Sequence, residues 1–224
     1  MTNGSLGREL DILANYPKTK RDVSARADEK TEEDRAIARQ FGKAFFDGER
    51  RHGYGGFHYH PRFWEPVVPT FQSVYDLDSH STVLDIGCAK GFMLYDFQRL
   101  VPGITLRGID ISEYAIEASL TEVKPFLDAG NAAALPYADN SFDLVIAINT
   151  LHNLEGQNLI DAFTEVMRVT RRHAFITVDA YRNEAEKDAM LNWNLTAKTI
   201  KSVEEWKVFF QDIGYTGDFF WFTP

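Results

Sequence analysis

A short apolar run that leads into a glycine-bearing turn constrains this chain more than any other segment. Residues 83–92 read VLDIGCAKGF, with an acidic residue ahead of the first glycine. This order indicates a buried strand, a tight turn and the start of a helix. Because Gly87 and Gly91 allow the backbone to turn sharply and to approach a ligand closely, the segment predicts a site for a nucleoside with a charged, flexible tail.

The spacing of the glycines separates two kinds of nucleotide site. A dinucleotide fingerprint requires Gly-x-Gly-x-x-Gly, and Ala89 and Phe92 stand where its second and third glycines would be. The pattern Asp85-x-Gly87-x-Ala89-x-Gly91 instead resembles the first motif of the class I S-adenosylmethionine (SAM) dependent methyltransferases of small-molecule type, Asp/Glu-x-Gly-x-Gly-x-Gly, with one glycine replaced. An ordinary strand–turn–helix is the alternative.

Three later features favour the resemblance. Asp110 ends the next predicted strand, where an acidic side chain can accept both ribose hydroxyls of a nucleoside. Residues 130–143 are similar to the family's Gly-Asp-Ala, Leu-Pro-Phe and Ser-Phe-Asp stretch, and residues 149–154 (NTLHNL) resemble its Leu-His-His-Leu segment. The resemblance covers about residues 82–178.

The resemblance implies SAM as the cofactor and S-adenosylhomocysteine (SAH) as its product. Asn131 replaces the family's acidic residue that accepts from the adenine amino group, and its amide oxygen can still accept while its NH₂ can donate. The predicted cofactor-binding residues are Asp85, Gly87, Cys88, Gly91, Asp110, Ile111, Asn131, Ala132, Asn149 and, from the preceding loop, Tyr59.

From residue 82 onward, apolar strands alternate with helical segments. We expect strands at residues 82–86, 105–109, 125–128, 143–148, 174–178 and 216–222. Helices are expected at 91–100, after Ser112 as N-cap, at 157–170 and at 203–213. The alternation predicts an α/β fold, an open, mainly parallel twisted sheet of six to seven strands with helices on both faces. The resembled family usually ends in an antiparallel strand pair, so the place of a seventh strand stays open.

The chain divides near residue 80. Residues 1–80 are predicted to form an N-terminal helical arm and a lid or substrate segment, and residues 81–224 a Rossmann-like SAM-binding catalytic domain. Residues 18–35 are densely charged, which indicates a solvated arm. Helices are expected over 31–47, stopping at Gly48, and over 67–75. Residues 53–64 form a loop rich in glycine, aromatic residues and histidine, and in the resembled family such segments often close over the cofactor as a lid.

The composition limits the classes of partner that this protein is expected to bind. The net charge of −9 disfavours a nucleic-acid substrate, and the single cysteine excludes an intramolecular disulfide or a multi-cysteine zinc site. No apolar run reaches the roughly 20 residues of a membrane span, and the N-terminus lacks a secretory signal. We therefore expect a cytoplasmic protein that acts on a small molecule, with no membrane partner.

Methyl transfer from SAM is an in-line displacement, so an enzyme mainly aligns the reacting atoms. A hydroxyl acceptor also needs a base, and His152, just past the fourth strand, is the predicted catalytic residue for that role. A histidine that only packs locally is the open alternative. His152 as a base favours O-methylation over N-methylation. The glycine–aromatic loop favours a sugar or phosphorylated metabolite as acceptor.

The substrate-binding residues are expected in the loop and in segments after the strands. They are His58, His60, Arg62, Trp64, Asn153 and Tyr181, and Asp179 is expected to line the pocket or to cap its strand. Arg62 can hold a phosphate or carboxylate with two hydrogen bonds. The alternative is that the large aromatic residues of the loop bury a helical cap against the sheet.

Several other readings remain. No metal site is predicted, because the two neighbouring histidines find no convincing set of partner ligands. N-methylation of a small metabolite, aminopropyl transfer and a catalytically silent SAM-binding partner are the alternative functions. The aromatic C-terminal run, residues 215–222, would be a hazardous open edge and could mark a homodimer contact.

Overall fold

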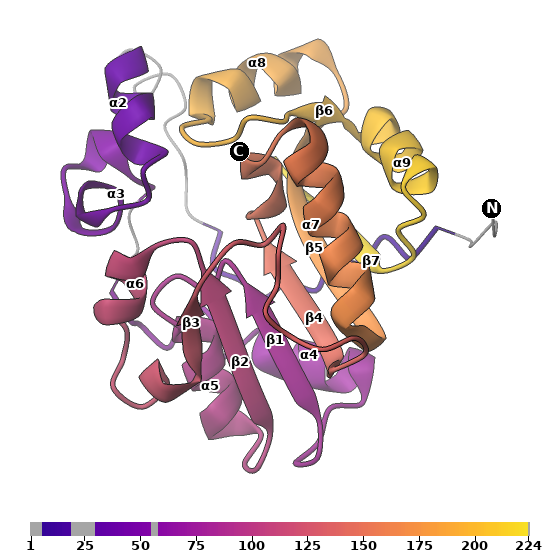
Figure 1. Cartoon of the computed structure of the whole chain (residues 1–224). Coiled ribbons are helices and arrows are strands. Elements are labelled where there is room, and N and C mark those ends of the chain that lie inside the picture. Colours follow the sequence, from indigo (N-terminus) through magenta and orange to yellow (C-terminus); the bar gives the residue numbers. More distant parts are fainter. Residues whose placement is uncertain (1–5, 19–29, 55–57, 224) are drawn as a thin grey trace.

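The computed structural model describes residues 6–18, 30–54 and 58–223. One sheet of seven strands has the order β3-β2-β1-β4-β5-β6, with β7 also paired to β5 (Figure 1). All of these pairings are parallel. The predicted open α/β sheet is therefore confirmed.

The strands are β1 (Thr82–Ile86), β2 (Thr105–Asp110), β3 (Leu127–Ala129), β4 (Phe142–Ile148), β5 (Thr170–Tyr181), β6 (Lys201–Ser202) and β7 (Asp218–Phe222). Six of them overlap the predicted runs, but β6 was not predicted, and residues 125–126, expected in the third strand, precede β3. The β5 strand is longer at both ends than its apolar run, since charged residues at its start also join the ladder. Its last residues pair with the short β6 and the preceding ones with β7.

Helices connect the strands and cover both faces of the sheet. They are α2 (Glu32–Ala38), α3 (Lys43–Asp47), α4 (Val68–Tyr75), α5 (Phe92–Leu100), α6 (Glu113–Glu117), α7 (Gly156–Val169), α8 (Glu184–Trp193) and α9 (Val203–Asp212), with 3₁₀ turns η1 (Arg50–His52), η2 (Lys124–Phe126) and η3 (Leu151–Asn153). Ser112 caps α6 as predicted, accepting from the backbone N–H of Ala115 at 3.0 Å. None of the helices among the described residues is long and apolar enough to cross a membrane.

The strand period divides the core into two layers. On β1 and β4, Val83 and Leu144 belong to the apolar cluster under α4 and α5, whereas their neighbours Leu84 and Val145 belong to the cluster under α7 and α9. All four side chains are fully buried. Because consecutive strand residues face opposite sides, a continuous apolar run is what a central strand covered on both faces requires.

The single helix expected over residues 31–47 is wrong: the chain forms α2 and α3 with a break between them. Phe41 takes a left-handed conformation (φ 49°), and Gly42 precedes the first residue of α3. The Phe41 carbonyl accepts a hydrogen bond from the Ser112 hydroxyl, a contact from a distant part of the chain. The predicted stop at Gly48 is confirmed.

The final strand differs from the pair typical of the resembled family. The β7 strand runs parallel to β5, because α9 returns the chain to the opposite end of the sheet before β7 begins. The far edge of β7 is covered by the N-terminal segment: Leu10 N donates to Phe219 O and Phe219 N to Arg8 O, both at 3.0 Å. The open aromatic edge that suggested a homodimer is thus paired within the chain.

The segment ahead of β1 has two separate packing environments. Ile12, Val68 and Phe71 are buried in the same cluster as the residues of α5. Residues of α2 and α3 instead form a smaller cluster with Ala115 and Leu195, above the carboxyl ends of the strands (Figure 1). The division of the chain near residue 80 stays a prediction.

Candidate functional site

The turn after β1 combines three left-handed residues. Gly87, Ala89 and Gly91 have φ angles of 79°, 50° and 74°. A Cβ atom on Gly87 would lie 2.1 Å from the Thr150 hydroxyl oxygen, so this position has no room for a side chain. Ala89, where the family pattern has glycine, adopts the left-handed conformation as well. The N–H groups of Gly87, Cys88 and Gly91 donate to backbone carbonyls, and that of Ala89 donates to Asp110, so hydrogen bonds within the protein fix the turn.

Asp110 at the end of β2 is fixed by that turn. Its carboxylate accepts from the backbone N–H groups of Ala89 (2.8 Å) and Ser112 (2.9 Å). Burial raises the pKa of Asp110 against the opposing effect of these two bonds. A carboxylate has about four acceptor positions, so two remain for ligand hydroxyls.

Asp85 is a buried acid at the end of β1. It is 5% exposed, and burial together with the charge of Asp110 raises its pKa to about 8. Among the described residues, the Asp85 carboxylate takes part in no ion pair with a basic side chain. A ligand cation would supply the positive charge that stabilises the ionised carboxylate.

The segment after β3 presents polar and apolar groups side by side. Asn131 Oδ1 accepts from Ala133 N at 2.9 Å, which leaves the amide NH₂ as the group available to a ligand. Ile111, after β2, keeps 59% of its surface exposed although it is a large apolar side chain. An apolar surface beside an amide donor suits a flat heteroaromatic ring.

These groups line one cavity of about 1540 Å³ at the carboxyl ends of the strands. The predicted cofactor residues in its lining are Asp85, Gly87, Cys88, Asp110, Ile111, Asn131, Ala132 and Asn149. The volume exceeds the 300–1,000 Å³ typical of a single-ligand site, so cofactor and acceptor can share it. Carboxyl ends of parallel strands are where open α/β sheets bind ligands.

Two predicted cofactor residues lie outside the lining. Tyr59 donates to Asp96 on α5 at 2.8 Å and accepts from Arg99 at 3.0 Å, and burial with Asp96 raises its pKa to about 12. Gly91 starts α5, and a Cβ there would meet Val123 at 2.9 Å. Tyr59 fastens its loop to α5, and Gly91 allows close packing of the helix.

His152 in η3 lies against Asp179 at the end of β5. Its Nδ1 accepts from the Asp179 backbone N–H at 2.9 Å, and its Nε2 lies 3.7 Å from Asp179 Oδ1. Burial lowers the pKa of His152, opposed by the nearby carboxylate, and raises the pKa of Asp179. The ring is therefore neutral with its proton on Nε2, and its lone pair is already used by the backbone. Both residues line the cavity.

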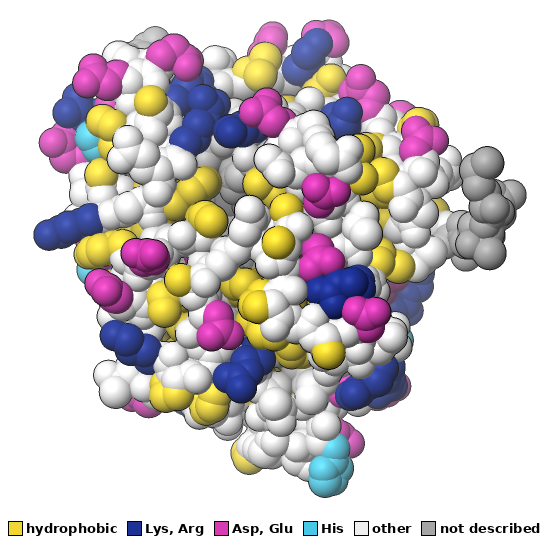
Figure 2. All heavy atoms as spheres, in the orientation of Figure 1, with side chains coloured by type: hydrophobic (Ala, Val, Ile, Leu, Met, Phe, Trp, Pro, Cys, Tyr) yellow, Lys and Arg dark blue, Asp and Glu magenta, His cyan; other side chains and the backbone are white. Residues whose placement is uncertain are grey.

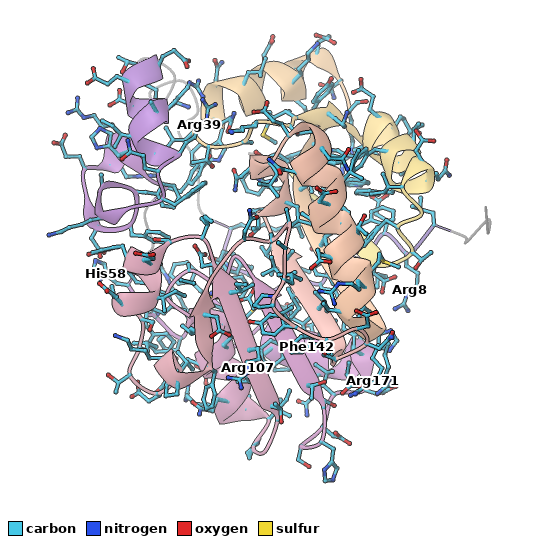
Figure 3. All side chains as sticks on the ribbon, viewed as in Figure 1. Arg8, Arg39, His58, Arg107, Phe142 and Arg171 are labelled. Atoms are coloured by element: carbon cyan, nitrogen blue, oxygen red, sulfur yellow. The ribbon has the colours of Figure 1, made fainter. Side chains whose placement is uncertain are left out.

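The predicted substrate residues fall into two groups. Arg62, Trp64 and Asn153 line the cavity, and Asn153 Oδ1 is buried without a hydrogen-bond partner among the described residues. His58 is exposed beside α6 (Figure 3), and His60 is exposed with Nδ1 accepting from Arg62 N. Tyr181 lies outside, 3.4 Å from Glu205 through its hydroxyl.

The sequence reasoning missed part of the lining. Phe45, Tyr54, Trp193 and Thr196 line the cavity, although none of them is among the predicted site residues. Tyr54 and Trp193 come together in the same wall with ring centroids 5.8 Å apart. Tyr54 belongs to the predicted aromatic loop, but its contact with Trp193 depends on tertiary packing.

The α2–α3 cap is fastened at both sides of the cavity. Lys90 of the cofactor turn, 5% exposed, donates to both oxygens of Asp47 on α3 at 2.7 Å, and the Tyr114 hydroxyl donates to the same carboxylate at 2.6 Å. On the other side, Arg39 donates to the Thr196 carbonyl at 3.4 Å, between α2 and the segment after α8 (Figure 3). The cap thus bridges the cofactor turn and the β5 side.

No group of three or more His, Cys, Asp or Glu side chains that could hold a metal ion occurs within residues 6–18, 30–54 and 58–223. The donor set instead fits SAM. The buried Asp85 suits an ammonium group, Asp110 suits the ribose hydroxyls, and the turn around Gly87 leaves room for close backbone approach. Asn131 and Ile111 would hold the adenine.

The fold is a Rossmann-like α/β fold with its cavity at the carboxyl ends of the strands. Residues 84–178 match the model of a family described as "Methyltransferase domain". Norajmaline N-methyltransferase of Rauvolfia serpentina is 30% identical over 120 residues, covering 50% of this chain and 40% of that protein. Demethylmenaquinone methyltransferase of a Roseiflexus species is 33% identical over 91 residues, covering 39% and 37%.

Among solved structures, the YcgJ protein of Bacillus subtilis is similar with a TM-score of 0.54, at 19% identity, covering 65% of this chain and 66% of that one. That likeness concerns the fold. The motif and the family match over residues 84–178 show that this part of the chain is similar to class I SAM-dependent methyltransferases, and the structural likeness agrees with that fold. The chain spans less than half the length of the curated relatives that it matches.

Proposed function

We propose that this chain transfers the methyl group of SAM to a small polar molecule. The observation that carries the proposal is the placement of Asp85, Asp110 and Asp179 in one cavity. The first two meet the ammonium and ribose groups of the cofactor, and the third is left on the β5 side for the acceptor. When bound, SAM supplies a methyl group that its sulfonium has already activated.

The chain's own residues then position the acceptor and take up its proton. His152 was the predicted base, but its lone pair already accepts from the Asp179 backbone. The carboxylate of Asp179, whose pKa burial raises, is the better proton acceptor at this place. His152 has a positioning role beside it: its Nδ1 accepts from the Asp179 backbone, and its Nε2 lies 3.7 Å from the carboxylate.

The cap over the cavity supports a reaction shielded from water. Phe45 and Tyr54 reach the cavity from the cap side, and Lys90 with Asp47 holds α3 against the cofactor turn. Exclusion of water strengthens the electrostatic contacts inside and protects the sulfonium. We propose residues 31–54 as a lid, whereas the sequence favoured the loop over residues 53–64, of which 55–57 lie outside the described residues.

A small molecule is favoured over nucleic acid. Positive and negative side chains are interspersed over the face in Figure 2, whereas phosphate binding needs a basic surface. The predicted sugar or phosphorylated acceptor would use Arg62 at the cavity. One relative, norajmaline N-methyltransferase, is named for N-methylation instead. A cytoplasmic location remains part of the proposal.

Calorimetric titration with SAH tests the proposal without knowledge of the acceptor. The protein should bind SAH, and Asp110→Asn should weaken binding at least about tenfold, since a charge-assisted contact to the ribose is lost. Asp212→Asn, an exposed site on α9 with the same charge change, is the control. Absence of SAH binding by the folded protein would contradict the assignment.

A further inference from the structure

The Asp179 carboxylate is a buried charge at the acceptor side of the cavity. It is 4% exposed, and among the described residues His152 is the group within ion-pair distance of it. Because that ring is neutral, it brings no positive charge to the carboxylate. A buried carboxylate in this setting favours a cationic ligand.

Aromatic side chains stand on the same side of the cavity. Tyr54 lies with its ring centroid 5.8 Å from Trp193 and 6.1 Å from Phe45, and all three line the cavity. The Asp179 charge contributes, after burial, to the raised pKa of Tyr54, so the two side chains are electrostatic neighbours. The Tyr54 hydroxyl oxygen accepts from Leu195 N at 2.8 Å, which fixes the ring. Faces of aromatic rings attract cations.

The basic residues of the cap have other partners. Lys30 donates to the carbonyls of Asn192 and Asn194, and Arg35 donates to the Asn194 carbonyl. These carbonyls lie in and directly after the last turn of α8, where a helix presents unpaired acceptors and negative dipole charge. The cationic groups of Lys30 and Arg35 are therefore held at the end of α8, and no ion pair joins them to Asp179 in the described part of the chain.

From this arrangement we propose, building on the methyl transfer proposed above, that the acceptor is an amine that binds as a cation between Asp179 and the rings of Tyr54 and Trp193, and that its nitrogen is methylated. The ammonium first gives one proton to the Asp179 carboxylate. The nitrogen lone pair then forms the N–CH₃ bond while the C–S bond of the cofactor breaks and its electron pair stays on sulfur. The neutral His152 ring packs beside the carboxylate, with Nε2 3.7 Å from Oδ1.

Benzylamine and benzyl alcohol are the probes, because they share one skeleton and differ in charge. Each is titrated by ligand-observed NMR into the protein saturated with SAH. Benzylamine should bind at least about tenfold more tightly than the alcohol, a difference expected of a charge-assisted contact with a buried carboxylate. Asp179→Asn should abolish that preference and leave SAH binding within about twofold, and Trp193→Leu should weaken benzylamine more than the alcohol.

Asp212→Asn, which changes the same charge on the exposed side of α9, should retain the full preference. Equal binding of the two probes, no binding of either, or a preference that survives in Asp179→Asn overturns the amine proposal. In each of those cases SAH binding still supports the methyltransferase. Failure of the folded protein to bind SAH is the separate result that removes the proposed function itself.

Discussion

Asp179 contacts both nitrogens of one imidazole: its backbone N–H donates to Nδ1 of His152 at 2.9 Å, and its Oδ1 lies 3.7 Å from Nε2. A single neutral tautomer satisfies both contacts, with the proton on Nε2. The backbone of β5 therefore sets the protonation of a side chain from η3, and the carboxylate of the same residue faces its N–H.

This relationship predicts how His152 titrates. Burial is the larger influence and lowers its pKa from 6.5, against the attraction of Asp179. A lowered histidine pKa contributes stability above 6.5, and that stability is lost as the pH falls toward the folded-state value. Long-range ¹H–¹⁵N NMR should show the Nε2–H tautomer at neutral pH and below 6.5.

His152→Asn is the matched variant, because it removes the titrating ring. The signal assigned to the ring should vanish, and the loss of stability on acidification should become smaller. An imidazolium at neutral pH, or a proton on Nδ1, would contradict the assigned tautomer and return the general-base role to His152.

Asp85 predicts a second pH dependence of opposite sign. Its pKa rises from 3.8 to about 8 on folding, because the side chain is buried and close to Asp110. The folded state then holds a proton that the unfolded state has released, so stability falls as the pH rises from 3.8 toward 8. The slope is at most about 1.4 kcal/mol per pH unit. Urea unfolding across this range measures it, and Asp85→Asn should flatten the curve.

The same residue links folding to the cofactor. If Asp85 meets the ammonium group, SAH binding lowers its pKa and releases a proton near neutral pH. Calorimetry in buffers of different ionisation enthalpy counts that proton. Asp85→Asn should bind SAH without the release, and an unchanged proton count in this variant would assign the titration to another group.

The main elements were predictable because their determinants are local. The β1 and β4 strands follow continuous apolar runs, and the N-cap of α6 follows from Ser112 alone. The break between α2 and α3 could not be predicted in this way. It occurs at the left-handed Phe41, whose carbonyl accepts a hydrogen bond from Ser112, far away in sequence. Local periodicity carries no information on such a contact.

The residues of the candidate site also fall into those that local sequence predicts and those whose role depends on distant contacts. Motif positions such as Asp110 reach the cavity because the sheet edge places them there. The role of His152 depends on which nitrogen the β5 backbone contacts, and the place of Tyr59 depends on Asp96. Residue type suggested the chemistry of both side chains, and their partners were set by packing between distant segments.

Gly87 is a position in the turn after β1 where a single methyl group should be harmful. Its φ is 79°, and an added Cβ would lie 2.1 Å from the Thr150 hydroxyl. We expect Gly87→Ala to cost at least about 3 kcal/mol, combining left-handed strain of about 1–2 kcal/mol with the clash, and to weaken SAH binding. Gly156→Ala is the matched control: φ is 57° with no atom within 4 Å, so it should show the strain alone.

Adding Thr150→Gly separates the two contributions. The double variant should recover the part of the unfolding free energy that the clash removed and retain the strain, as urea denaturation would show. Equal losses for Gly87→Ala and Gly156→Ala would mean that the turn relaxes away from Thr150, and the tight cradle would then not be a requirement of the site.

Asp218 holds the N-terminal segment on the edge of β7. Its carboxylate accepts from the Arg8 backbone at 2.9 Å, from the Arg8 guanidinium at 2.7 Å and from Tyr75 at 3.1 Å. Asp218→Asn should cost about 1–3 kcal/mol, since the buried Tyr75 hydroxyl and the Arg8 groups lose a charged acceptor. Amide exchange of residues 6–13 should accelerate, and light scattering should detect self-association through the uncovered strand. The control Asp212→Asn, at an exposed site on α9, should change neither the amide exchange nor the self-association. Unchanged amide exchange in Asp218→Asn would show that the backbone hydrogen bonds of residues 8–10 suffice to cover the edge of β7.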